Sequence, residues 1–120
     1  MSSEPGTEDL AAEDLKIIAL ARSARARTGA AAGAAVRDDA GRSYVATTVT
    51  LSSLALSAVQ VAVAMAVSSG AGPLEAAALV TEEDIDADVD LAVLRETGGP
   101  AGVRVIRADP AGIVQSVALA

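Results

Sequence analysis

The chain has 120 residues, a formal net charge of −7 at pH 7, no Cys and no His. This composition excludes disulfides, thiolate chemistry and the commonest general base and metal ligand. It also argues against a nucleic-acid binder, because affinity for phosphate backbones comes mainly from clustered Lys and Arg. The length fits one domain: we expect a disordered polar tail at residues 1–9, a folded unit at residues 10–120, and a cytoplasmic location.

The core must be built from small side chains, because Tyr44 is the only aromatic residue. Burying a Val or Leu side chain contributes about 1.5–3 kcal/mol, and an Ala methyl contributes far less. A small domain of this kind, without disulfides or metal, is marginally stable alone. We therefore expect a homo-oligomer, a dimer or tetramer, in which apolar helix surface is shared between subunits.

The first predicted element is a helix that begins near Thr7, whose side chain can cap it. Its apolar residues recur at helical spacing and give it one apolar side: Leu10, Ile17, Ile18 and Ala21. Three cations lie at its C-terminal end, where they suit the helix dipole: Arg22, Arg25 and Arg27. An anion-binding patch is the alternative interpretation of these arginines.

A hairpin is predicted next. A Gly/Ala-rich segment, residues 28–35, leads into a short strand that ends near Val36 and Arg37. Residues 38–41 have the composition of a turn, and residues 42–50, rich in Val and Thr, form the partner strand.

The longest apolar stretch, residues 51–70, is predicted to contain a central helix capped by Ser52 or Ser53. Its apolar residues are spread right around a helical wheel, which indicates a helix buried in a core or in a membrane. Ser57 and Gln60 interrupt the run, and a membrane span needs about 20 apolar residues, so a buried core helix is favoured. A strand pair and a membrane span are the alternatives, the first because of the Val-x-Val spacing.

The C-terminal half alternates strands with one more helix. Glycines and a proline at residues 70–73 end the central helix. The predicted elements are a strand at 75–80, an acidic segment at 81–90, a helix at about 86–97, an edge or half-exposed strand at 103–108, a turn at 109–112 and a last strand at 113–119. The order αββαβαββ indicates a single layered α/β domain.

Several local motifs carry a resemblance. Ala32-Gly33-Ala34-Ala35-Val36 is similar to a V-G-A-A-L type strand, and Ala40-Gly41-Arg42 to a D-G-R turn. Ser57-Ala58-Val59 stands where a central helix opens with C-A-E, and Val67-Ser68-Ser69-Gly70 is similar to its V-S-x-G type end. These motifs and the element order resemble the cytidine deaminase family. The resemblance implies a three-layer αβα domain with a mixed sheet.

The family's functional groups are changed in this chain. In the family, three Cys, or a His and two Cys, hold zinc, and a Glu shuttles protons. The resemblance places Ser57, Ala87 and Asp90 at the zinc positions and Val59 at the Glu position. Zinc lowers the pKa of bound water from 15.7 to about 7, which favours hydroxide by about 12 kcal/mol. Since these side chains cannot supply that, the resemblance predicts a degenerate member with no metal, no cofactor and no enzymatic activity.

Two further polar segments remain. The family's ribose motif, N-x-E, falls near residues 48–50, so a small polar pocket is predicted from Thr48, Thr50, Ser52 and Ser53. The alternative is that these residues only form strands and cap a helix. The Asp residues at 86, 88 and 90 have the spacing that begins a calcium loop, but Leu91 stands where Gly is required, so an acidic helix N-terminus explains them better.

Two functions follow from these patterns. The first is a non-catalytic protein that acts through protein–protein contacts or as a subunit, with residues 81–90 and 22–27 as candidate surfaces. The second is a metal-free sensor of a nucleoside-like small molecule, with residual cytidine deaminase activity as a distant alternative. Neither nucleic acid nor a membrane is expected as a partner.

Overall fold

The computed structural model of the chain describes residues 10–82 and 87–120. In chain order its elements are α1 (Ala12–Thr28), β1 (Ala32–Asp38), β2 (Ser43–Thr47), β3 (Val49–Thr50), β4 (Ala55–Leu56), α2 (Ala58–Ser68), β5 (Leu74–Thr81), α3 (Ala87–Thr97), β6 (Arg104–Ala108) and β7 (Val114–Leu119). Five strands form one sheet in the order β2-β1-β5-β6-β7, and β3 pairs with β4 in a separate short hairpin. Only β5 and β6 pair in parallel among these described strands, so the sheet is mixed.

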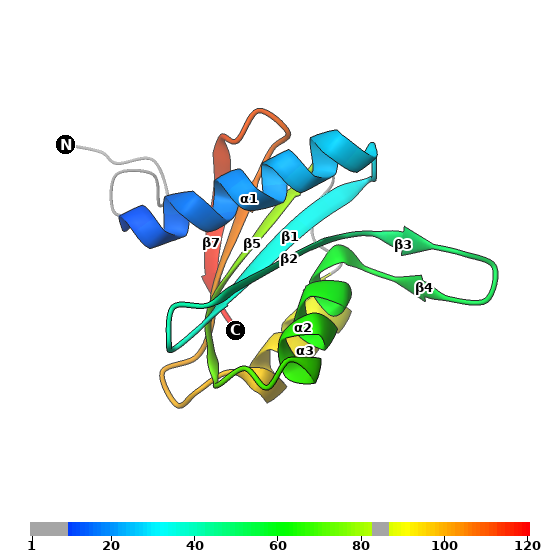
Figure 1. Cartoon of the computed structure of the whole chain (residues 1–120). Coiled ribbons are helices and arrows are strands. Elements are labelled where there is room, and N and C mark those ends of the chain that lie inside the picture. Colours follow the sequence, from blue (N-terminus) through cyan, green and yellow to red (C-terminus); the bar gives the residue numbers. More distant parts are fainter. Residues whose placement is uncertain (1–9, 83–86) are drawn as a thin grey trace.

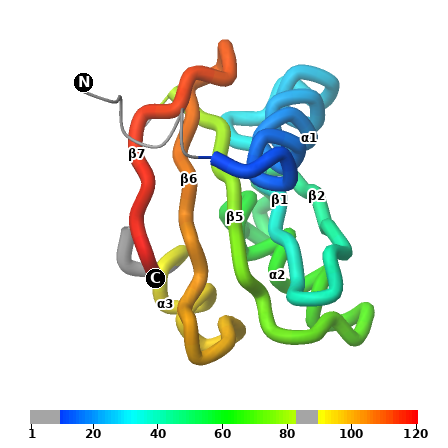
Figure 2. The backbone as a smooth tube through the Cα atoms, turned by 90° about the vertical axis from the view of Figure 1, so that its left-hand side faces the viewer, coloured from blue at the N-terminus to red at the C-terminus, as the bar shows by residue number. Residues whose placement is uncertain are grey.

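The helices cover both faces of the sheet: α1 lies on one, and α2 and α3 on the other (Figure 1 and Figure 2). Alternate residues of β1 point to opposite faces, so Ala34 and Val36 pack beneath α2 while Ala35 packs beneath α1. This arrangement confirms the predicted three-layer αβα domain with a mixed sheet.

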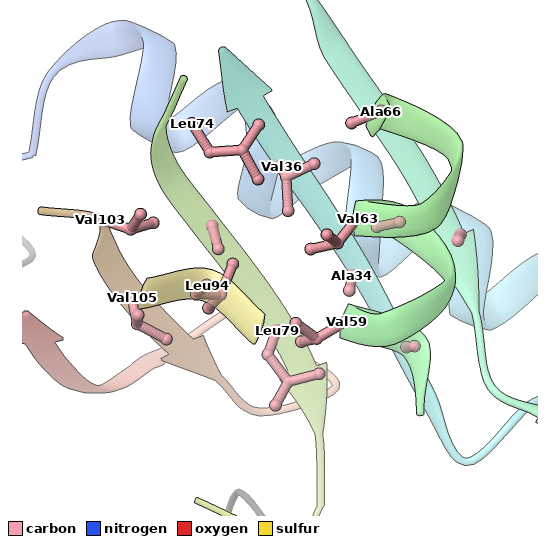
Figure 3. Close-up of a cluster of buried hydrophobic side chains, with 14 residues drawn as sticks. Ala34, Val36, Val59, Val63, Ala66, Leu74, Leu79, Leu94, Val103 and Val105 are labelled. Carbon is pink, nitrogen blue, oxygen red and sulfur yellow. The ribbon is translucent and has the colours of Figure 1, made fainter. Parts of the chain in front are cut away.

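Small side chains set the spacing of the layers. Figure 3 shows the part of the core that lies between the sheet and helices α2 and α3. Val and Leu side chains fill it together with many alanines, for example Val59, Val63, Leu79 and Leu94. On the other face α1 approaches β1 so closely that a Cβ on Gly33 would lie 2.1 Å from the carbonyl oxygen of Ala21. A glycine is therefore required at that point of the motif.

The N-terminal boundaries differ from the prediction. Helix α1 begins at Ala12, and its N-cap Ala11 makes no side-chain hydrogen bond. Thr7, the predicted cap, and the whole predicted disordered tail at residues 1–9 lie outside the described residues. The apolar side of α1 is confirmed, since Ile17, Ile18 and Ala21 are buried.

The central helix starts later than predicted. Its N-cap is Ser57, not Ser52 or Ser53, because residues 49–56 form the β3–β4 hairpin instead. Reciprocal backbone hydrogen bonds between Leu51 and Leu54 close the turn of this hairpin. The strand alternative for the apolar run is wrong, because the valines of its Val-x-Val spacing, residues 59, 61 and 63, lie in α2.

The same helix is not buried all round. Its inner face is buried, but Met65 is 43% and Val67 61% exposed on the outer face. None of the helices in residues 10–82 and 87–120 has the length and hydropathy to cross a membrane. Residues 103–108, predicted as an edge or half-exposed strand, are not at an edge, because β6 lies between β5 and β7. The half-exposed alternative fits β6 better, since Arg104 is exposed and Val105 and Ile106 are buried. Arg104 pairs with Asp14 on the α1 face.

Candidate functional site

The N-terminal ends of α2 and α3 meet at a polar contact. The hydroxyl of Ser57 donates a 2.6 Å hydrogen bond to Oδ1 of Asp90, a residue that is 5% exposed. The same hydroxyl accepts a hydrogen bond of 3.0 Å from the backbone N–H of Gln60. The Gln60 side-chain oxygen in turn accepts from the Ser57 N–H at 3.0 Å, which completes a capping box at the start of α2.

An open cavity of about 410 Å³ lies beside this contact. Figure 1 shows the β3–β4 hairpin projecting from the body next to the start of α2, and this hairpin forms one wall. The lining residues come from both hairpin strands and both helices: Thr48, Val49, Thr50, Ala55, Leu56, Ser57, Gln60 and Asp90. We call this space the Ser57–Asp90 cavity.

Two of the four residues predicted for a polar pocket reach this cavity. Thr48 and Thr50 line it, whereas Ser52 and Ser53 are exposed in the turn of the hairpin and do not. Thr48 also has a structural role, because its hydroxyl oxygen accepts a 3.2 Å hydrogen bond from the Ala32 N–H.

Of the four positions that correspond to the family's functional groups, two line the cavity. Ser57 and Asp90 come together at the cavity. Val59 is 1% exposed and packs in the core beside Leu79, as Figure 3 shows, so it does not line the cavity. Ala87 is the first residue of α3.

Sequence reasoning missed Gln60 as part of this site. The signal was present, because Ser57-x-x-Gln60 has the spacing of a capping box at a helix start. The prediction that Ser52 or Ser53 caps the helix drew attention away from it.

The donor atoms at this site do not fit the zinc ion that the family fold implies. Protein zinc is held mainly by thiolate sulfur and imidazole nitrogen, with closed or nearly closed tetrahedral geometry. Here the positions supply a hydroxyl, a methyl and one carboxylate, and the hydroxyl is already committed to Asp90 and to Gln60. Within residues 10–82 and 87–120, no three or more acidic, His or Cys side chains are grouped to hold a metal.

Other predicted surfaces are placed as follows. The Arg22 guanidinium donates to the carbonyl of Pro110 at 3.1 Å, and Arg25 donates to that of Ala31 at 3.1 Å. Arg25 also lies 3.8 Å from the carboxylate of Glu82. These contacts favour the structural interpretation of the two arginines over an anion patch. Most of the predicted acidic surface at residues 81–90, with the candidate calcium ligand Asp86, lies outside the described side chains.

A second charged cluster lies on the α1 face of the sheet. Asp14 of α1 is fully buried and accepts from Arg37 at 3.0 Å and from Arg104. Glu75 is the extra residue of a bulge in β5 opposite Arg37, and the bulge aims its carboxylate at Nε of Arg37, 2.6 Å away. Burial alone would lower the pKa of Arg37, but the hydrogen bonds and charges of Glu75 and Asp14 outweigh it and raise that pKa. This cluster fastens α1 to the sheet.

Comparison with known proteins gives one family. The family model described as cytidine deaminase-like matches residues 10–112, and no curated protein matches significantly. The chain is similar to the crystal structure of a cytidine deaminase from Burkholderia pseudomallei, with 22% identity over 87% of this chain and 90% of that one and a TM-score of 0.74. It is similar to a mutant cytidine deaminase from Mycobacterium tuberculosis, with 28% identity over 75% and 81% of the two chains and a TM-score of 0.63. It is also similar to a cytidine deaminase from Mycobacterium leprae, with 23% identity over 83% of this chain and 89% of that one and a TM-score of 0.59.

These comparisons overturn one prediction. We predicted that the chain is not an enzyme, but the solved structures that it matches are cytidine deaminases, which are enzymes. The lack of a grouped metal site among the described residues does not show that activity is lost. The family model spans most of the chain, so the chain belongs to the cytidine deaminase-like family.

Proposed function

We propose that the chain binds a nucleoside-like small molecule in the Ser57–Asp90 cavity. The observation that carries this proposal is the part-buried hydrogen bond from Ser57 to the buried carboxylate of Asp90, at the wall of a cavity of about 410 Å³. Small-molecule sites have volumes of about 300–1,000 Å³, with mostly apolar walls and a few placed polar groups. Membership of the cytidine deaminase-like family supports a nucleoside as the ligand class.

Binding is tested by thermal shift and calorimetry with cytidine, uridine, adenosine and the free bases. A ligand selective for the native state raises the melting temperature in a saturable way. Ala55→Trp fills the cavity from an exposed wall position, and Ala26→Trp places the same side chain on α1, across the sheet. We expect Ala55→Trp to abolish the shift and Ala26→Trp to retain it. No shift with any of these compounds would overturn the proposal.

Turnover is measured in the same samples, because the structural relatives are enzymes. Loss of the nucleoside and release of ammonia are followed across the fractions of the protein peak. Product that tracks the peak and disappears in Ala55→Trp would assign a reaction to this cavity.

The exposed face of α2 favours a second proposal, that the chain associates with copies of itself. Helix α2 contains no charged residue, and Met65 and Val67 are exposed on its outer face. A chain of net charge −7 repels its own copies over most of its surface, so an uncharged apolar face is the one suited to self-association. We therefore propose that this face of α2 packs against a second copy in a dimer or tetramer.

Light scattering behind gel filtration tests this assembly. Val67→Glu places a charge in the proposed interface and should yield a monomer, whereas Leu15→Glu, at an apolar position 49% exposed on α1, should not. A wild-type protein that stays monomeric at high micromolar concentration would contradict the assembly without affecting the binding proposal.

A further inference from the structure

We infer that β7 pairs, edge to edge, with β7 of a second copy of the chain, and that this contact joins two dimers formed through the α2 face into a tetramer. The inference rests on the proposed self-association through α2 and adds to it a second interface on a different surface. It does not depend on whether a ligand binds in the Ser57–Asp90 cavity.

β7 is an edge strand whose outward hydrogen-bonding groups can be identified residue by residue. Val103 and Ala120 exchange both backbone hydrogen bonds, at 3.2 and 2.8 Å, and Ala118 lies two residues back along the same ladder. Hydrogen-bonded and non-hydrogen-bonded pairs alternate in an antiparallel ladder, so Ala118 also turns its N–H and C=O toward β6. Val117 and Leu119 therefore turn theirs away from β6, where no strand in the described part of the chain pairs with them.

These outward groups are self-complementary about Ala118. When two copies of β7 lie antiparallel with Ala118 opposite Ala118, Val117 of each copy lies opposite Leu119 of the other. Both members of such a pair turn their N–H and C=O toward each other, so they exchange both backbone hydrogen bonds. A two-fold axis at Ala118 relates the copies, which is the commonest symmetry of homo-oligomers. The strand that best completes this edge is therefore the same strand of a second copy.

β7 lacks the features that usually keep edge strands from pairing. Edge strands are commonly protected by a charged residue, by a proline or by a bulge. β7 contains neither a charged residue nor a proline, and its bulge, at Gln115, precedes the stretch that would pair. Because the chain has a net charge of −7, an uncharged edge lets two copies meet without direct repulsion between carboxylates.

The side chains of β7 favour the same pairing. Leu119 is 70% exposed, more than any other large apolar side chain in the described ranges. It lies opposite Arg104 of β6, on the α1 face of the sheet, where α1 packs mainly on β1, β2 and β5 (Figure 2). In the paired edges Leu119 of each copy lies beside Val117 of the other, and apolar cross-strand pairs of this kind stabilise sheets.

The two proposed interfaces lie toward opposite edges of the sheet. α2 packs on β1 and β2, whereas β7 is the strand at the far edge (Figure 2). A single edge contact covers few residues, so it should not hold two separate chains together. A dimer formed through α2 carries two β7 edges, and pairing both at once strengthens the contact through effective concentration. Val67→Glu, which breaks the α2 contact, is therefore still expected to be monomeric.

The register of the contact is tested by cross-linking, because the chain has no Cys and a single introduced thiol is unique. Ala118 is exposed, and Ala118→Cys places two thiols opposite each other in a non-hydrogen-bonded pair. The Cα atoms of such a pair lie about 4.5 Å apart, within the roughly 4.4–6.8 Å that a disulfide spans. Ser116→Cys is the matched control on the same strand and face, because the two copies of residue 116 would lie roughly 14 Å apart.

We expect mild oxidation to give a covalent dimer on a denaturing gel with Ala118→Cys and not with Ser116→Cys. Equal cross-linking of the two variants, or none with Ala118→Cys, would overturn the pairing of the β7 edges.

Light scattering behind gel filtration supplies the second arm. We expect a tetramer for the wild type and a dimer for Leu119→Lys, because a lysine on an edge strand blocks pairing. Gln115→Lys adds the same charge at the exposed bulge of the same strand and should remain tetrameric. A Leu119→Lys protein that stays tetrameric would contradict the inference. A wild-type dimer would overturn the β7 contact and leave the α2 contact standing, whereas a wild-type monomer would overturn both.

Discussion

The hydroxyl of Ser57 and the carboxylate of Asp90 lie 2.6 Å apart and join the N-cap of α2 to the first turns of α3. The resemblance assigns both positions to zinc ligands. In this chain a hydrogen bond between these side chains connects the two helices directly. The contact therefore combines two tasks: it holds the helix ends together, and it forms the polar end of a cavity.

Replacing Ser57 by Ala removes both the N-cap and the partner of Asp90. Losing an N-cap costs about 0.5–2 kcal/mol, and the lost hydrogen bond to a buried carboxylate adds to it. We expect the free energy of unfolding in urea to fall by about 2 kcal/mol. Ser23→Ala is the control, because Ser23 is exposed in the middle of α1 and its loss should not lower stability. Equal stability of the two variants would show that the Ser57–Asp90 contact is not stabilising.

Local chemistry was sufficient to predict much of the fold. The turn residues at 38–41 correctly predicted the hairpin of β1 and β2. The Gly-Gly-Pro sequence at residues 98–100 stops a helix, and α3 ends at Thr97, directly before it. These signals act over a few residues, so tertiary packing does not override them.

The site was harder to predict, for physical reasons. Ser57 and Asp90 are 33 residues apart, and no local pattern reports a contact of that range. The exposed face of α2 was hidden because its residues are apolar on every side, so the helical wheel shows no polar stripe to mark it. The β3–β4 hairpin was missed because β3 falls inside the strand predicted at residues 42–50 and β4 inside the apolar run at residues 51–70.

Asp14 fastens α1 to the sheet through two arginines, so its loss should be costly. Removing one partner of a buried ion pair costs about 3–5 kcal/mol, because the other charge stays buried. Arg37 is 7% exposed but keeps Glu75 as a partner. We therefore expect Asp14→Ala to lower the free energy of unfolding by an amount near the lower end of that range. Urea unfolding at a fixed protein concentration measures this. Glu13→Ala, which removes the same charge from an exposed neighbour, should change stability little, and a similar loss in both variants would contradict the role of Asp14.

Asp38 should make the free energy of unfolding fall at acidic pH. Burial alone would raise the pKa of this carboxyl, but hydrogen bonds from the N–H groups of Arg42, Gly72 and Ala40, together with the charge of Arg42, hold the pKa below its ordinary 3.8. A depressed native pKa contributes stability above the unfolded value, and that stability is lost as the pH falls below about 3.8 through the lower native value.

The test compares unfolding curves between pH 7 and pH 2. Asp38→Asn should melt several degrees lower at pH 7 and show a shallower decline below pH 4 than the wild type. Asp39→Asn removes a carboxylate from the exposed neighbouring position and leaves the hydrogen bonds of Asp38 in place. A wild-type acid slope in Asp38→Asn would mean that other carboxylates control acid unfolding.

Gly33 tests the close packing of α1 on β1. A Cβ at this position would lie 2.1 Å from the carbonyl oxygen of Ala21, which is helix backbone and cannot rotate away. Overpacking a core costs about 1–3 kcal/mol when side chains can adjust, so Gly33→Ala should exceed that range and shift the melting temperature downward or prevent folding. Gly99→Ala is the matched control, because its Cβ would meet only the Pro73 ring at 3.4 Å. A Gly33→Ala protein as stable as Gly99→Ala would show that α1 can move outward freely, and the small-residue spacing of the layers would then not be a requirement of the fold.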